Sequence, residues 1–215
     1  MNVNGVKFGD KHSFDDWGLV LTEKSLGLPE PKTSGIEIEG ADGELDTTEV
    51  LSGEVKFSNR TLTFIFTMMD KYEDYHDKVT EIANYLHGRK MRIILDEDDL
   101  CYYYGRCAVN EWLCDRRIGK ISISCNCEPY KYDLNETIVT ATVNGTTRLN
   151  IYGKRKTVCP TIKVVGDVTM LIGDETITLY EGMNEILDFY IREGNNILDF
   201  IGNGTVEISF IGGEL

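Results

Sequence analysis

The stretch ISISCNCEPYKY, residues 121–132, contains the side chains with the most obvious capacity for chemistry. Cys125 and Cys127 carry sulfur donors that could bind zinc or exchange disulfides. A structural zinc site needs two further ligands, however, and the three histidines of the chain lie far from this pair in the sequence. In a strand, residues two positions apart share a face, so both cysteines join an apolar stripe with Ile121 and Ile123. The pattern therefore predicts packed thiols that behave as small hydrophobic side chains.

Three other groups of residues could support chemistry, and each is explained more simply as structure. His12, His76 and His87 are candidates for a neutral-pH base, but none has a nucleophile or metal partner at a recognisable spacing. The acidic run at 96–99 lacks the alternating pattern and distal glutamate of a calcium loop. The segment GNNILDFIGNG, residues 194–204, lacks the GxGxxG, GKS or GKT of a phosphate loop. The sequence therefore predicts no catalytic, cofactor or metal site.

Charge and composition narrow the class of protein further. The chain has 215 residues, with 22 Lys and Arg against 36 Asp and Glu, and a net charge of -14. The negative electrostatic field of so acidic a chain repels phosphate backbones, so nucleic-acid binding is disfavoured. There is no run of ~18 apolar residues and no apolar core of a signal peptide. We therefore expect synthesis in a cytosol, no membrane anchoring and cysteines that stay as thiols.

The first 130 residues predict an α+β domain, with Phe14, Trp17 and Leu19 as core anchors near its start. Asp42-Gly43 predicts a hairpin turn, and TLTFIFTM, residues 61–68, predicts a strand with one apolar face. A helix is expected between residues 70 and 88, followed by a β meander that Pro129 ends. Asp70 and Glu73 stand at capping-box spacing, Gly88 can end this helix, and its apolar stripe is Tyr72, Tyr75, Val79, Ile82 and Leu86.

Beyond Tyr132 the pattern contains no further helix. Asn144-Gly145 is the strongest hairpin signal in the chain and predicts two strands within residues 137–152. Further short strands follow, separated by Gly, Asn and Asp, as in a β-sandwich or jelly roll. The sequence therefore predicts a mainly β protein. An N-terminal α+β domain, a β-barrel or sandwich with one helix, spans 1–132, and a C-terminal β-sandwich spans 133–215.

A β-sandwich can also present a sugar-binding surface. Sugar sites commonly use an exposed aromatic side chain, especially Trp, as a stacking platform. Trp17 and Trp112 both lie in the first domain, so a site in the second would depend on Tyr or Phe. An enzyme such as a wall hydrolase would need a carboxylate pair or a metal triad, and no carboxylate is distinguished by the sequence. Assembly and sugar binding are the two classes of function kept open.

Several segments occur in a fixed order along the first half of the chain. They are FDDWGLVL, IEIEGADGELDTTEVLSG, NRTLTFIFT, a helix ending in LHG, YYYGRC and GKISISCNCEPYKY. This order resembles the N-terminal domain of phage distal tail proteins, the Dit family of long-tailed phages that infect mainly Gram-positive hosts. In that family the strand leading to C-x-P-Y closes the first domain. The second half, from CPTIKVVG to TVEISF, resembles the galectin-like C-terminal β-sandwich of the family.

The resemblance implies a structural role without catalysis or cofactor. It implies a homo-hexameric ring at the distal end of the tail tube, located in the virion tail tip. This ring serves as the hub on which tail-tip, tail-associated and receptor-binding proteins are mounted, so the partners are copies of the chain itself, the tail tube protein and those components. The alternative is a carbohydrate-binding adhesin that contacts the host cell surface through its C-terminal sandwich.

Overall fold

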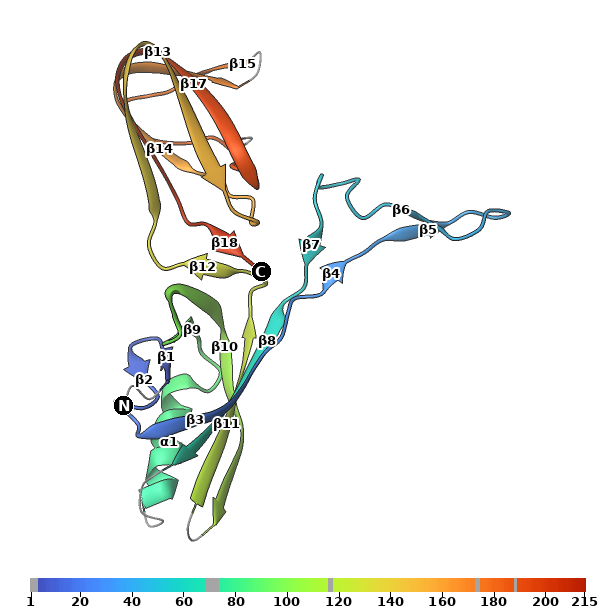
Figure 1. Cartoon of the computed structure of the whole chain (residues 1–215), viewed down its shortest axis with the longest axis vertical. Helices are drawn as coiled ribbons and strands as arrows, with labels where there is room; N and C mark the ends of the chain where they lie inside the picture. The colour runs from blue at the N-terminus through green and yellow to red at the C-terminus, as the bar shows by residue number, and fades with distance from the viewer. Residues whose placement is uncertain (1–3, 69–73, 116–117, 173–174, 188) are drawn as a thin grey trace. The chain divides into compact units, whose positions relative to one another are not determined.

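The computed structural model describes residues 4–68, 74–115, 118–172, 175–187 and 189–215 (Figure 1). Most of these residues lie in antiparallel strands, and one α-helix is found among them. The chain divides into two compact units. The first comprises residues 1–131 with Leu215, and the second comprises residues 132–214. The predicted fold class, mainly β with a helix in the first half only, is confirmed for the described residues.

One antiparallel sheet forms the framework of the first unit. Seven strands follow one another in the order β2-β1-β9-β10-β11-β8-β3. Because β9, β10 and β11 are neighbours in both sequence and space, they form the predicted meander. The strands are β1 (Val6–Phe8), β2 (Lys11–His12), β3 (Leu19–Leu26), β8 (Arg60–Met68), β9 (Lys90–Leu95), β10 (Asp98–Asp115) and β11 (Ile118–Cys127).

The core of the first unit is built on strict alternation along these strands. In β8 every second residue from Leu62 to Met68 is buried, as predicted. The ring of Phe8 packs edge-on against the rings of Phe64 and Phe66. Trp17 and Leu19 are also fully buried, and they confirm two of the three predicted anchors. The third prediction was wrong, because residues 13–17 form a turn that leaves Phe14 37% exposed.

Helix α1 (Tyr75–Leu86) packs into the same core. Four members of the predicted stripe are buried: Tyr75, Val79, Ile82 and Leu86. Asp70, Tyr72 and Glu73 lie outside the described residues. The helix ends at the C-cap residue His87, and Gly88, the residue predicted to end it, follows in the left-handed conformation with a φ of +79°. No helix in the described part of the chain is long and apolar enough to cross a membrane.

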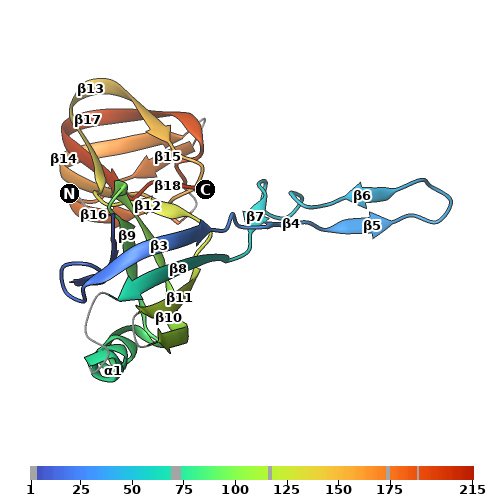
Figure 2. The same ribbon diagram turned by 60° about the horizontal axis from the view of Figure 1, so that its bottom comes forward.

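A long hairpin, residues 27–58, leaves the first unit between β3 and β8 (Figure 1, Figure 2). We term it the arm. The ladder of β3 and β8 continues into it, because Gly27 N–H donates to Thr61 C=O and Ser58 N–H donates to Glu30 C=O. The predicted turn at Asp42-Gly43 joins its outer strands. The strands of the arm are β4 (Pro31–Lys32), which pairs with β7 (Lys56–Phe57), and β5 (Gly35–Glu37), which pairs with β6 (Glu44–Asp46).

The second unit contains a five-stranded antiparallel sheet in the order β13-β17-β14-β15, with β16 also paired to β14. Its pairing is unusually long. β13 and β17 remain in register from Thr137 opposite Phe210 to Gly153 opposite Gly194. The strands are β13 (Thr137–Gly153), β14 (Thr161–Ile172), β15 (Glu175–Thr178), β16 (Gly182–Glu185) and β17 (Gly194–Phe210); the short β12 (Lys131–Asp133) and β18 (Gly213–Glu214) pair with each other.

The turn predicted at Asn144-Gly145 is wrong. Both residues lie in the middle of β13, opposite Asn203 and Gly202 of β17. The strands predicted on either side of Gly166 are likewise one strand, β14, and those predicted on either side of residues 202–204 are one strand, β17. A local hairpin did not form because the pairing partner of residues 137–153 is the distant strand β17.

These turn signals form a crease across the sheet instead. Gly145 lies opposite Gly202, and Gly166 lies opposite Gly204. The φ angles of Gly145, Gly166 and Gly202 are +79°, +98° and +135°, which residues with a side chain rarely adopt. Figure 1 shows β13, β14 and β17 bending together.

The folded sheet makes both layers of a β-sandwich. On β14, Val164 before the crease and Met170 after it both face inward, because the alternation keeps its parity across the bend. Phe200 and Val206 of β17 do the same, and all four belong to one core. A single sheet therefore buries both of its halves against each other.

Replacing Gly202 by Ala should test the crease. An added Cβ would lie 2.1 Å from Asp167 C=O, so the two strands must separate. We expect Gly202→Ala to lower the free energy of unfolding of the second unit by roughly 3 kcal/mol or more. Gly194→Ala is the matched control, since Gly194 has a φ of +92° but an open surrounding; it should cost only about 1–2 kcal/mol. Equal losses of unfolding free energy in urea would contradict the crease.

Candidate functional site

The two cysteines that opened the search for chemistry lie in the core of the first unit. Cys125 and Cys127 are fully buried, in agreement with packing as small hydrophobic side chains. Burial raises the pKa of Cys127 to about 12, and a hydrogen bond with Cys107 together with burial raises the pKa of Cys125. Thiols in this state make poor ligands and nucleophiles. Among the described residues, no three His, Cys, Asp or Glu side chains are grouped to hold a metal ion.

The acidic run at 96–99 ties segments of the first unit together. The carboxylate of Asp96 accepts the Gly5 N–H at 2.7 Å and lies 3.2 Å from Nε2 of His12. Asp98 pairs with Nζ of Lys131 at 3.0 Å. These carboxylates are directed at separate protein partners and do not converge on a common point.

The other predicted candidates also have structural partners. Nδ1 of His87 accepts the Val109 N–H at 3.1 Å, and this bond fixes the end of α1 to β10. The ring of His76 packs edge-on against Trp112, with 4.8 Å between centroids. Trp17 is fully buried. Trp17 therefore offers no ring face to a sugar, and Trp112 is partly buried beside His76.

The arm, in contrast, leaves apolar side chains without a cover. Every residue from 30 to 46 is exposed. Ile36 lies directly opposite Leu45, and Glu37 lies opposite Glu44. Since residues opposite each other share a face of the ribbon, one face is apolar and the other is acidic. Ile36 and Leu45 are 54% and 55% exposed.

The arm is poorly stabilised by its own contacts. A two-stranded ribbon with no layer packed on it is marginally stable in water. Like charges directly opposite each other, as at Glu37 and Glu44, weaken it further. Residues 27–58 contain eight acidic side chains and only two lysines. These properties suit a surface that contacts another molecule with apolar groups and positive charge.

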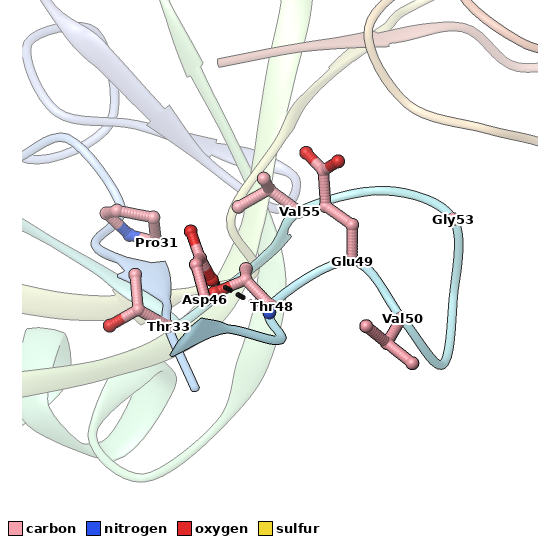
Figure 3. Close-up of a pocket in the computed structure, with 8 residues that line it drawn as sticks. All are labelled: Pro31, Thr33, Asp46, Thr48, Glu49, Val50, Gly53 and Val55. Atoms are coloured by element: carbon pink, nitrogen blue, oxygen red, sulfur yellow. Dashed lines mark hydrogen bonds between the residues drawn. The ribbon is translucent and has the colours of Figure 1, made fainter. Parts of the chain in front are cut away.

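A shallow cleft of about 650 Å³ lies where the chain loops out between β6 and β7 (Figure 3). Asp46 accepts the Thr48 N–H at 2.9 Å, and its bonds to Thr48 hold the pKa of this carboxyl below its usual value. Val50 and Leu51, next in the loop, are 74% and 100% exposed. The cleft is lined by Pro31, Thr33, Asp46, Thr48, Glu49, Val50, Gly53 and Val55. This mixed, open lining adds contact surface to the arm and brings no reactive groups together.

Arg60 holds the root of the arm. It is only 4% exposed, and its guanidinium lies 5.0 Å from the ring centroid of Tyr103. Nε donates to Gly27 C=O at 2.8 Å, and Nη1 donates to Pro129 C=O at 3.4 Å. Gly27 begins the arm and Pro129 follows β11, so one buried cation ties the arm to the exit of the first unit.

A second contact at the root involves the stretch that first looked reactive. The ring of Phe57, on β7, packs edge-on against Tyr130 at 6.0 Å. Next to it, Nδ2 of Asn59 donates to Oδ1 of Asn126 at 2.9 Å. The segment CNCEPYKY therefore contributes packing for the arm root.

The fold has a counterpart among solved structures, although no family model and no curated protein matches the sequence. One solved structure that it resembles is the Dit protein of phage SPP1, with a TM-score of 0.72 and 15% sequence identity over 98% of this chain and 99% of that chain. SPP1 Dit is described as a paradigm of the hub adsorption apparatus in phages that infect Gram-positive bacteria. The resemblance found in the sequence is confirmed at the level of the fold.

Two features of this site were not found by reading the sequence. The alternation IEIE, residues 36–39, marks a two-faced strand, but it does not show that the apolar face lacks a cover. Arg60 precedes the apolar run of β8, and no local signal distinguishes a buried arginine from an exposed one. A buried charge is recognised only through its acceptors, which come from residues 27 and 129.

Arg60→Met should destabilise the first unit by roughly 2–4 kcal/mol, because the buried guanidinium is removed and two partly buried carbonyl groups lose their donor. Lys90→Met is the matched control. Lys90 also lies over a tyrosine ring and pairs with Glu128, but its side chain is 41% exposed, so the loss should stay below about 1 kcal/mol. Unfolding in urea gives both values. Equal stability of Arg60→Met and the unaltered protein would exclude Arg60 as the anchor of the arm.

Proposed function

We propose that this chain is a structural protein of a phage tail, located at the distal end of the tail tube in the virion, and that it acts without making or breaking a bond. The observation that carries the proposal is the arm, whose strands pair in two short ladders and whose apolar face is exposed. The whole-chain likeness to a tail hub protein supports the same reading.

The arm favours assembly into a closed ring. We propose that its apolar face meets a different surface of the next copy, and such a contact between unlike surfaces of identical chains is heterologous. A heterologous contact closes into a ring when its rotation divides a full turn evenly. Six copies, as the sequence resemblance implies, is the number proposed here. The first unit, which carries the arm, is proposed as the ring-forming domain.

The remaining surfaces are proposed to hold other tail components. One side of the ring would meet the tail tube protein, and the other would meet tail-tip or tail-associated proteins and the receptor-binding protein. The second unit presents apolar side chains that suit such contacts, since Tyr180, Met183 and Leu187 are 76%, 70% and 75% exposed. No sequence-specific nucleic-acid contact and no membrane contact is proposed.

A carbohydrate-binding adhesin is the second candidate. The second unit has exposed tyrosines, with Tyr152 74% and Tyr180 76% exposed, and a tyrosine ring can stack on a sugar. A glycan array separates the two functions. Glycan binding by an unassembled chain, abolished by Tyr152→Ala or Tyr180→Ala, would favour the adhesin.

The double variant Ile36→Ser with Leu45→Ser tests the arm as an assembly surface. Both residues are half exposed, so the free energy of unfolding of the isolated chain should change by less than about 0.5 kcal/mol. Covering each side chain in an interface contributes about 1 kcal/mol or more. Self-association measured by light scattering should therefore weaken at least about tenfold per interface.

The control is Ile138→Ser with Ile197→Ser on the second unit, where the exposed fractions are 57% and 56%. This pair removes the same apolar groups from a face outside the arm and should leave self-association unchanged. Electron microscopy of the unaltered protein should show rings. A protein that stays monomeric at every concentration and is missing from purified tails would overturn the proposal.

A further inference from the structure

Cys107 and Cys125 lie directly opposite each other on two central strands of the first unit, β10 and β11. Their Sγ atoms are 3.3 Å apart, and both side chains are fully buried. Neither residue takes part in the proposed assembly surface. Two facing thiols are the starting arrangement for a cross-strand disulfide, provided that the two backbones are close enough.

Backbone hydrogen bonds show that they are. Cys107 N–H donates to Arg89 C=O at 2.9 Å, and Gly88 N–H donates to Cys107 C=O at 2.8 Å. Both polar groups of Cys107 thus point away from β11, which makes Cys107 and Cys125 a non-hydrogen-bonded pair. In such pairs the Cα atoms are about 4.5 Å apart, inside the range of roughly 4.4–6.8 Å found for disulfides. Closure then needs side-chain rotation without separation of the strands.

We propose that Cys107 and Cys125 form a redox modification site, a latent disulfide that closes when the protein meets a low-molecular-weight disulfide such as oxidised glutathione. One protein thiolate attacks the small disulfide, which releases one small thiol and leaves a mixed disulfide. The second protein thiolate attacks the protein sulfur of that bond and releases the second small thiol. The protein loses two protons and two electrons, and one oxidised glutathione becomes two reduced molecules.

Burial controls the rate of this reaction. The thiolate is the attacking species, and the hydrogen bond and burial that raise the pKa of Cys125 keep it protonated. The oxidant also has no path to either sulfur while β10 and β11 remain packed. Closure therefore proceeds through local opening of the sheet and accelerates when opening becomes more frequent.

The inference depends on the proposed function only for its setting, in which a virion component leaves the reducing cytosol for an oxidising medium. The bond would link β10 to β11, and β11 is the strand that leads to Pro129 at the arm root. Closing the loop between Cys107 and Cys125 restricts the unfolded chain and so raises the unfolding temperature. The site would make the tail component more durable after release than during assembly.

The test uses the full chain carrying Cys159→Ala, which removes an exposed thiol. It is incubated with oxidised glutathione at several urea concentrations below the unfolding transition, then alkylated, digested with trypsin without reduction and examined by mass spectrometry. We expect a cross-linked pair of peptides, 107–116 with 121–131, to form faster as urea rises. The oxidised protein should unfold about 5–10 °C higher, and dithiothreitol should reverse the shift.

Three variants locate the bond, because each peptide contains two cysteines. Cys114→Ala and Cys127→Ala should keep the cross-link, and Cys125→Ala should lose it. Cys127 is the matched control for Cys125, since both are fully buried on the same face of β11. A cross-link that survives in Cys125→Ala, or full alkylation of Cys107 and Cys125 after prolonged oxidation near the urea midpoint, would overturn the proposal. The peptide masses do not depend on ring assembly, so this result is independent of the proposed function.

Discussion

In an antiparallel ribbon, neighbouring side chains face opposite ways, and an apolar face that meets water must be covered by something. Each part of this chain meets that requirement differently. In the first unit the meander is covered by α1 and by its own aromatic residues. In the second unit the sheet covers itself. The arm is a two-stranded ribbon without a layer packed on it, and its apolar face remains exposed. This uncovered apolar face is the property on which the proposed assembly surface rests.

The crease shows how one sheet becomes two layers. If the chain turned at Asn144-Gly145, the two halves of β13 would pair with each other and not with β17. Their inward-facing residues would then need a different partner. Because Gly145, Gly166 and Gly202 accept a positive φ, three long strands bend together without losing register. The parity of the inward residues is preserved across the bend. The two halves of each strand therefore contribute to the same core.

The elements that sequence reading identified correctly are those whose partners are close in the chain. The stripe of α1 repeats within 12 residues, and β8 carries its own alternation. The turn at Asp42-Gly43 joins strands that follow each other directly. Phe14 was misjudged because the turn that contains it directs the next aromatic residue, Trp17, into the core instead. Asn144-Gly145 has the same local preferences as a hairpin turn, and local preference alone cannot exclude the distant partner β17.

The sequence by itself determined the mainly β class of fold, the helix in the first half, the packed thiols on β11 and an acidic charge that disfavours nucleic-acid binding. These follow from short-range alternation, helix periodicity and net charge, which depend on residue order alone. Only the tertiary structure decided that three turn signals form one crease, that Arg60 is buried between two carbonyl groups, and that the apolar face of the arm lacks a cover. Each of these depends on which distant segment pairs with which, because burial and hydrogen bonding are properties of the assembled sheet.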